Sequence, residues 1–235
     1  MKFINQSTEI IPQEEGINGI YKQIELAGRV CYKSEDKITE DSAKSFVDML
    51  IENKHYAALE HGTVYLSIPS SADSNTILSY TYNPYSKVCI DNYNNFCVTT
   101  NYRVLIENGW LDDLKYLCEP TEYHPKRVTV KFITDQGILR EFTRHRKFSF
   151  CVESTRYCNY SKNKFDASLT YILPDWISKE VIDKNFYDGS YFANPANKEV
   201  IITDRFKSAL KQCEYVYMEL IKNPTASKKC IAISY

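Results

Sequence analysis

Residues 128–146 read VTVKFITDQGILREFTRHR and set out a strand, a helix cap, a short helix and a basic loop in that order. Val128, Val130 and Phe132 alternate with polar residues, which predicts a half-buried strand. The turn-forming residues 135–137 predict the cap of a short helix over 138–143. The end of that helix delivers three successive basic residues. With other segregated helices and antiparallel-looking strands in the chain, this order indicates an α+β fold.

The basic stretch 144–157 gathers Arg144, His145, Arg146 and Arg156 with hydroxyl side chains and one carboxylate. Arginine forks match phosphate and carboxylate oxygens, so the stretch is predicted to hold an anionic ligand. Most charge runs are simply solvated. Here the apolar or aromatic residues at 148, 150, 152 and 157 should pack the segment down. Packing cations without an anionic partner is costly, so we expect a bound anion.

The length, net charge and cysteine spacing of the chain limit which classes of protein it can belong to. The 235 residues are predicted to form one domain, 1–235, and the formal charge of −1 argues against nucleic acid or an anionic membrane as partner. The eight cysteines form no Cys-x-x-Cys pair, so we expect reduced, mostly buried thiols and no metal. Residues 1–6 lack the apolar run of a secretory signal, and no apolar run reaches the ~18 residues of a membrane span. A cytoplasmic protein is predicted.

Helical spacing of apolar residues predicts helices over 16–31 and 198–222. The apolar seam of the second, which should face another helix, consists of Phe206, Leu210, Cys213, Tyr217 and Leu220. Another helix is expected to start at Thr39 as N-cap, with Glu40 and Asp41 in its first turn. Its buried stripe is predicted to consist of Ala43, Phe46, Val47, Leu50 and Ile51.

Strands are expected at 63–68 and near 96–100, and a helix near 110–117. Residues 69–127 are rich in turn-forming residues and tyrosines, which indicates an elaborated insertion that packs on the domain.

Three further features invite functional interpretations. His55 and His61 stand six residues apart, which does not suit two zinc ligands on one helix face; a functional loop and a structural turn with Glu60 bonded to backbone are equally supported. Ser154 as a nucleophile would need a base and an orienting group that its neighbours do not supply. Cys151 and Cys158 would be reactive if the arginines lowered their pKa, but small buried thiols are the commoner case.

The spacing Arg144-His145-Arg146, seven residues, then Ser154 resembles the signature of the flavin-dependent thymidylate synthases. Other blocks are similar to that family in the same order: 27–34, 55–61, and 157–162 after the signature. The resemblance spans about 17–68 and 128–222, with 69–127 as an insertion.

The resemblance implies a homotetramer with shared active sites that binds FAD and uses NADPH and methylenetetrahydrofolate to convert dUMP to dTMP. The residues implied to contact FAD are Arg144, His145 and Arg146, with His55 or His61 near the flavin. The residues implied to face the nucleotide are Arg140, Glu141, Arg144, Glu153, Ser154 and Arg156. Ser154 is then a ligand contact and no catalytic nucleophile is implied.

This sequence departs from the family pattern at three places. Cys151-Val152 stands where many members have Asn-Glu, and Ala57 stands where a Ser or Thr is common. The family also continues beyond the last long helix, so the chain is expected to be short at the C-terminus. Two alternatives follow: a catalytically weak or silent relative that only binds nucleotide or flavin, and a module that binds single-stranded nucleic acid by stacking.

Overall fold

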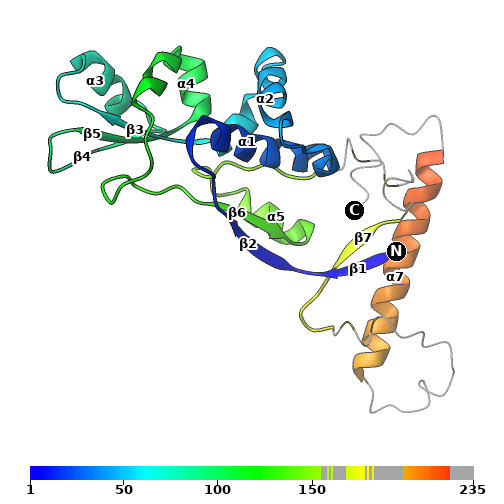
Figure 1. Cartoon of the computed structure of the whole chain (residues 1–235). Coiled ribbons are helices and arrows are strands. Elements are labelled where there is room, and N and C mark those ends of the chain that lie inside the picture. Colours follow the sequence, from blue (N-terminus) through cyan, green and yellow to red (C-terminus); the bar gives the residue numbers. More distant parts are fainter. Residues whose placement is uncertain are drawn as a thin grey trace. The chain divides into compact units, whose positions relative to one another are not determined.

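The computed structural model describes residues 1–154, 158, 160, 168–177, 179, 182 and 198–222 (Figure 1). The chain divides into two compact units. We call Glu9–Lys131 with Thr143–Glu153 the sheet unit, and Met1–Thr8, Phe132–Phe142 and Ser154–Tyr235 the terminal unit. The single domain over 1–235 stays a prediction. The mixture of helices and small sheets in these units is compatible with the predicted α+β class.

A three-stranded antiparallel sheet organises the sheet unit, in the order β3 (Thr63–Ile68), β5 (Phe96–Asn101), β4 (Lys87–Ile90). Strand β3 runs antiparallel to β5, from Thr63 opposite Asn101 to Ile68 opposite Phe96. The side chains at positions 64, 66 and 68 are buried while those at 65 and 67 are half-buried. The alternation therefore predicted β3 correctly, and the strand near 96–100 is also confirmed.

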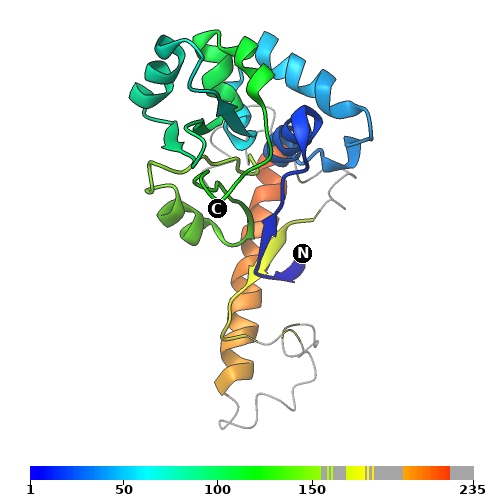
Figure 2. The same cartoon turned by 60° about the vertical axis from the view of Figure 1, so that its left-hand side comes forward.

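Helices cover this sheet and share one core with it. They are α1 (Gly16–Tyr32), α2 (Ser42–Glu52), the 3-10 helix η2 (Tyr56–His61) and α4 (Tyr102–Asn108). Helices α1 and α2 lie side by side (Figures 1 and 2). Fully buried side chains of this core include Ile24, Val47, Leu59, Leu66, Val98 and Leu105. Burying each such side chain contributes roughly 1.5–3 kcal/mol, which makes this core the main source of the unit's stability.

The start of α2 differs from the prediction. The helix begins at Ser42 with Asp41 as N-cap, so Thr39 is not the cap and Glu40 lies before the helix. The reason is a turn closed by Ser42, whose hydroxyl accepts from the Thr39 N–H at 2.9 Å and donates to Glu25 Oε2 at 2.8 Å. Of the predicted buried stripe of α2, positions 43, 46, 47 and 50 are buried and Ile51 is half-buried.

The segment 69–127, predicted as an insertion, supplies part of this core. It holds α3 (Ser74–Tyr82), two of the three strands, α4, and the 3-10 helix η3 (Leu111–Tyr116). The predicted helix near 110–117 is thus a 3-10 helix and not an α-helix. Tyr80 of α3 is fully buried and donates a hydrogen bond to Asp113 Oδ2 at 3.0 Å, which ties α3 to η3.

The strand, cap and helix read from 128–143 are present. Strand β6 (Thr129–Ile133) begins one residue later than predicted and pairs with β2 (Ser7–Ile11). Helix α5 (Gln136–Phe142) follows. Asp135 caps it, since its Oδ1 accepts from the N–H groups of Gly137 at 2.7 Å and Ile138 at 3.0 Å.

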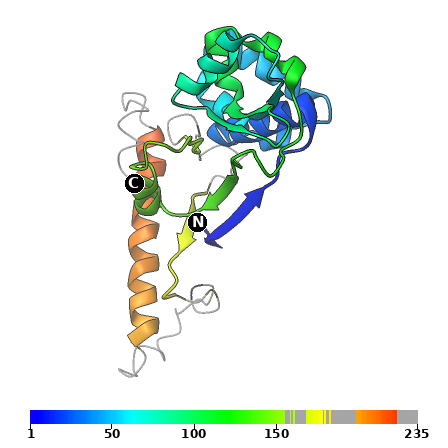
Figure 3. The same cartoon turned by 90° about the vertical axis from the view of Figure 1, so that its left-hand side faces the viewer.

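In the terminal unit β1 (Lys2–Asn5) pairs in parallel with β7 (Thr170–Leu173), as Figure 3 shows. Antiparallel strands had been predicted, so this parallel pair is a difference. A parallel pair needs a long connection between its strands, and the many residues between β1 and β7 provide one. Helix α7 (Lys198–Lys222) has the predicted bounds. Its Tyr217 packs on Leu169, and the Tyr171 hydroxyl donates to the Leu210 carbonyl at 3.3 Å.

The seam of α7 therefore contacts the β7 segment in the described part of the chain, where we had expected another helix. Cys213, assigned to this seam, is exposed. The expectation of mostly buried cysteines is also wrong, since of the seven described thiols only Cys97 and Cys158 are buried. Among the helices of the described residues, none is both long enough and apolar enough to cross a membrane.

Candidate functional site

Glu60 joins the histidine block to the basic stretch within the sheet unit. Its Oε1 accepts a hydrogen bond from Arg103 Nη1 at 2.5 Å, and its Oε2 accepts one from Ser149 Oγ at 2.5 Å. Glu60 belongs to η2, Arg103 to α4, and Ser149 to the segment Thr143–Glu153, which we call the signature loop. The Glu60 side chain is half-buried, so these charge-assisted bonds are shielded in part from water.

Arg127 supports the same residue from the backbone side. Its guanidinium donates to the carbonyl of Glu60 at 2.9 Å and to that of Thr100 at 3.3 Å, while its own N–H donates to the Tyr65 hydroxyl at 3.2 Å. Burial lowers the pKa of Arg127, and the nearby Tyr65 and Glu60 oppose that shift. Arg127 thus fixes the end of η2 against β3 and β5.

His61 is the one predicted histidine with a perturbed environment. Burial lowers its pKa, the charge of Arg127 lowers it further, and Glu60 acts in the opposite direction. Its Nε2 is buried and has no hydrogen-bond partner among the described residues. The imidazole is therefore neutral at pH 7, and its buried Nε2 is an unused hydrogen-bonding group.

The three basic residues predicted to contact the flavin stand at the surface of the signature loop. Arg144, His145 and Arg146 are all exposed. A turn follows them, closed by the Phe148 N–H donating to the His145 carbonyl at 3.0 Å. The His145 ring lies 5.6 Å from the ring of Phe148, whose side chain is 63% exposed. The loop thus presents cationic and aromatic groups together, the pairing that suits a planar anionic ligand.

The second half of the signature loop packs against the end of α1. Lys33 Nζ lies 3.2 Å from Glu153 Oε1. Cys151 also packs on the apolar core of the sheet unit. Ser149, Cys151 and Glu153 stand at alternate positions of this segment, and the contact of each one anchors it.

The remaining predicted residues are distributed as follows. His55 is exposed and precedes η2 as its N-cap, with its N–H donating to the Leu50 carbonyl at 2.8 Å. Arg140 and Glu141 lie near the end of α5, in the terminal unit. The Ser154 carbonyl accepts from the Cys158 N–H at 3.0 Å. Arg156 lies outside the described residues.

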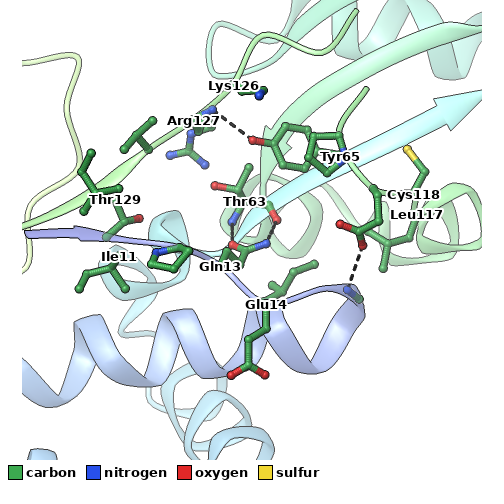
Figure 4. Close-up of a pocket in the computed structure, with 17 residues that line it drawn as sticks. Ile11, Gln13, Glu14, Thr63, Tyr65, Leu117, Cys118, Lys126, Arg127 and Thr129 are labelled. Carbon is green, nitrogen blue, oxygen red and sulfur yellow. Dashed lines mark hydrogen bonds between the residues drawn. The ribbon is translucent and has the colours of Figure 1, made fainter. Parts of the chain in front are cut away.

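A pocket of about 450 Å³ opens elsewhere in the sheet unit (Figure 4). Arg127, Tyr65, Thr63 and Gln13 line it, and the Gln13 amide is fully engaged with the backbone of Thr63, at 2.9 and 2.8 Å. Within the described part of the chain, the predicted site residues do not contribute to its lining. Among all the residues that the structure describes, no group of three or more acidic, histidine or cysteine side chains is arranged to hold a metal ion.

Sequence reasoning missed the residues that organise this site. Glu60 was expected, as a structural turn, to bond to backbone; its carboxylate bonds instead to the side chains of Arg103 and Ser149. Ser149, two positions from the predicted Cys151, was passed over, and Arg103 and Arg127 lie in or at the end of the insertion. The signal for Glu60 was its position as the lone carboxylate between His55 and His61 in a chain with only four histidines, and the two arginines carried no such signal.

Comparison with known proteins places part of the chain in a family. Residues 124–230 match the family described as thymidylate synthase complementing protein. No curated protein and no solved structure matches the chain. The matched range starts before β6 and includes α5, the signature loop, β7 and α7.

Over residues 124–230 the chain is thus similar to the thymidylate synthase complementing proteins. These are the flavin-dependent thymidylate synthases, so the family recognised from the Arg-His-Arg signature is confirmed. The similarity of 27–34 and 55–61 lies outside the matched range and stays a prediction.

Proposed function

We propose that this protein is a thymidylate synthase that depends on FAD and NADPH and methylates dUMP to dTMP with methylenetetrahydrofolate. The observation that supports it most is the hydrogen bond from Ser149 to Glu60. It connects the signature loop, inside the matched range, to His61, which lies outside that range. Two blocks that the family resemblance assigns to one flavin site are thus joined through neighbouring residues of a single compact unit.

The described residues fit a flavin. The unpartnered Nε2 of His61 can form a hydrogen bond with the cofactor once a local movement uncovers it, and the exposed Arg144 and Arg146 offer positive charge for the anionic part of the cofactor. When bound, FAD supplies hydride transfer, which protein side chains cannot perform. The protein's part is to bind and orient the cofactor, with His61 neutral and the guanidinium groups of Arg144 and Arg146 charged. His55, exposed at the start of η2, is the weaker candidate for a flavin contact.

The proposed nucleotide contacts come from both ends of the basic region. They are Arg140, Glu141, Arg144, Glu153, Ser154 and Arg156. The arginines would neutralise the phosphate of dUMP and fix its orientation. Ser154 would act as a hydrogen-bonding contact. Glu153 already forms an ion pair with Lys33, so a nucleotide that used Glu153 would have to share or displace that cation.

We further propose that the protein acts in the cytoplasm as a homotetramer in which subunits share active sites. An exposed basic loop is consistent with a site completed by a second subunit, because such a loop needs an opposing surface to exclude water. The oligomeric state can be measured by light scattering on the purified protein, with and without dUMP.

The direct test uses purified full-length protein reconstituted with FAD. We expect a yellow protein whose flavin spectrum shifts on adding dUMP, and which forms dTMP when NADPH and methylenetetrahydrofolate are also present. The Arg144→Ala variant should lose the dUMP-induced shift. Lys147→Ala, which removes an exposed cation three positions away, is the matched control and should behave as the parent.

The outcomes separate the competing functions. A spectral shift without dTMP would identify a relative that only binds flavin and nucleotide. A protein that takes up no FAD but binds single-stranded DNA in a salt-sensitive way would point to the nucleic-acid module. Failure to take up FAD under any condition would exclude the proposed enzyme.

A further inference from the structure

Strand β4 is the outer strand of the antiparallel sheet in the sheet unit. Strand β5 lies between β3 and β4 (Figure 1), and no strand of the described residues pairs with the second edge of β4. The register of β4 on β5 is continuous, from Lys87 opposite Thr99 to Ile90 opposite Phe96, and β4 contains no proline. Such an edge presents backbone donors and acceptors to another strand unless a bulge, a proline or a charge protects it.

The hydrogen bond from the Asp91 N–H to the Asn95 carbonyl, at 3.0 Å, fixes which residues of β4 face outward. Residues of an antiparallel pair alternate between hydrogen-bonded and non-hydrogen-bonded positions. The bond at Asp91 places the odd-numbered residues of β4 in the hydrogen-bonded positions on β5. The N–H and C=O groups of Val88 and Ile90 therefore point to the free edge, and the Ile90 side chain is 57% exposed.

We propose that β4 pairs with β4 of a second copy of this chain, antiparallel, around a two-fold axis at Cys89. The outward backbone groups then form hydrogen-bonded pairs in which Val88 lies opposite Ile90 of the second copy. In the same register Lys87 lies opposite Asp91 of the second copy, and the two Cys89 residues face each other, all at non-hydrogen-bonded positions. Because a two-fold axis repeats each contact, this single edge is complementary to itself.

Charge complementarity selects both the partner and the register. Lys87 is exposed, and the Asp91 carboxylate is held at the end of the strand by the N–H groups of Tyr93 and Asn95, both at 2.8 Å. Side chains directly opposite each other on adjacent antiparallel strands have Cβ atoms ~4.5–5.5 Å apart, and opposite charges there stabilise the pair. The two-fold axis forms this charge pair twice. A shift of two residues in either direction would separate Lys87 from Asp91.

Exposed aromatic side chains stand next to this edge in the sequence. Tyr82 and Tyr85 precede β4 and are 81% and 73% exposed, and Tyr93 in the turn after β4 is 83% exposed. Tyrosine is enriched in the buried centre of protein interfaces, where its ring packs and its hydroxyl keeps a hydrogen-bond partner. A second copy on β4 would give these rings a surface to pack on.

Cross-linking through Cys89 tests the register in the full-length protein. Non-hydrogen-bonded partners have Cα atoms ~4.5 Å apart, within the ~4.4–6.8 Å that a disulfide spans. Reduced protein with the exposed Cys213 replaced by Ser is treated with diamide, an oxidant that takes the two hydrogens of a thiol pair. We expect a dimer on a non-reducing gel. When isotope-labelled and unlabelled protein are mixed before oxidation, the peptides joined through Cys89 should include pairs of one labelled and one unlabelled copy.

Two variants disfavour the contact and spare the pairing of β4 with β5. Ile90→Pro deletes an outward N–H that β5 does not use. Lys87→Glu sets like charges opposite each other at both ends of the pair. Each should lower the yield of the Cys89 cross-link roughly tenfold, since an edge without its hydrogen bond or with opposed like charges pairs poorly. Lys37→Glu, at an exposed lysine in the 3-10 helix Glu35–Lys37, makes the same change of charge and should keep the yield of the parent.

Oxidation that joins Cys89 to Cys97 within one chain, or joins only other cysteines between chains, would overturn the proposal. A yield unchanged by Lys87→Glu would overturn it as well. Hydrogen exchange in the parent needs no variant to fold: the N–H groups of Val88 and Ile90 should be protected only at concentrations at which copies associate. Protection that persists in the dissociated chain would mean that another segment of the same chain covers β4. These outcomes involve neither flavin nor nucleotide, so they are independent of the proposed enzyme activity.

Discussion

The Ser149 hydroxyl donates a hydrogen bond to Glu60 Oε2 at 2.5 Å, across 89 positions of the chain. The other carboxylate oxygen accepts from Arg103 at 2.5 Å. Glu60 is therefore held from two sides, by α4 and by the signature loop. Since His61 is the next residue, a displacement of Glu60 would also displace the unpartnered imidazole. Stability of the loop and the geometry of the proposed flavin site are coupled through this one carboxylate.

We expect Ser149→Ala and Glu60→Gln each to destabilise the protein and weaken flavin binding. Removing one partner of a half-buried, charge-assisted hydrogen bond costs roughly 1–3 kcal/mol. The two residues share one bond, so the double variant should lose less than the sum, with a coupling energy of about 0.5–3 kcal/mol. Urea unfolding of the four proteins measures the free energies, and FAD titration measures the affinity.

Glu107→Gln is the matched control, because Glu107 is the other carboxylate bound by Arg103, at 2.9 Å. This pair is more exposed and lies four residues apart on α4, where such ion pairs contribute about 0.3–0.5 kcal/mol. If Glu107→Gln weakened FAD binding as much as Glu60→Gln, the special role of Glu60 would be refuted.

Gly62 should not tolerate a larger side chain. A Cβ there would lie 2.7 Å from Ile24 Cδ1 and 2.8 Å from Ile20 Cγ2, both on α1. We expect Gly62→Ala to cost about 1–3 kcal/mol, because overpacking forces neighbouring side chains or backbone to move. At Gly109, φ is +71° and a Cβ would meet nothing within 4 Å. Gly109→Asn is thus a control that should cost less; equal loss in thermal unfolding would contradict the packing argument.

Regular amphipathic segments were predictable because one face of each is buried against a single surface. This holds for α1, for β3 and for the buried stripe of α2. Prediction failed where long-range contacts decide the local structure. Strand β1 is fixed by its parallel partner β7, and the start of α2 by the bond from Ser42 to Glu25, neither of which leaves a periodic trace.

The candidate site was predictable only where its residues stand together in the sequence. Arg144, His145 and Arg146 are consecutive, so the sequence itself displays them. Arg103 and Arg127 reach Glu60 only after the insertion has folded onto η2, and a lone arginine in a long insertion carries no pattern. The low exposure of His61 likewise follows from packing between η2 and α1, which one sequence does not disclose.

His61 should make the protein less stable in mild acid. Its pKa in the folded state is lowered by burial and by Arg127, so below its unfolded value of ~6.5 the unfolded chain binds a proton that the folded protein resists. Stability contributed by the neutral imidazole is present above ~6.5 and is lost as the pH falls toward the lowered folded value. Urea unfolding of the parent and His61→Gln across this range should show a shallower acid loss in the variant.

Variants of the Lys33–Glu153 ion pair can distinguish a structural role of Glu153 from a role in binding dUMP. Each side chain is 36% exposed, so breaking the pair should cost no more than ~1 kcal/mol. If Glu153 contacts dUMP as proposed, Glu153→Gln should weaken dUMP binding severalfold at nearly unchanged stability. Lys33→Met removes the same ion pair and leaves Glu153 in place, so it should not weaken dUMP binding. Equal effects of both variants on affinity would show that only the ion pair matters.

Arg127 should control the titration of His61 as well as the position of Glu60. Its charge is the second cause of the lowered pKa of His61, after burial, so Arg127→Met should raise that pKa toward its ordinary value. Arg127→Lys keeps the charge and loses the forked pair of bonds to the carbonyls of Glu60 and Thr100, so it should destabilise the fold and raise the pKa less. NMR titration of the His61 ring, with urea unfolding in parallel, distinguishes charge from hydrogen bonding. A pKa raised equally by both variants would mean that backbone displacement, and not the charge of Arg127, perturbs His61.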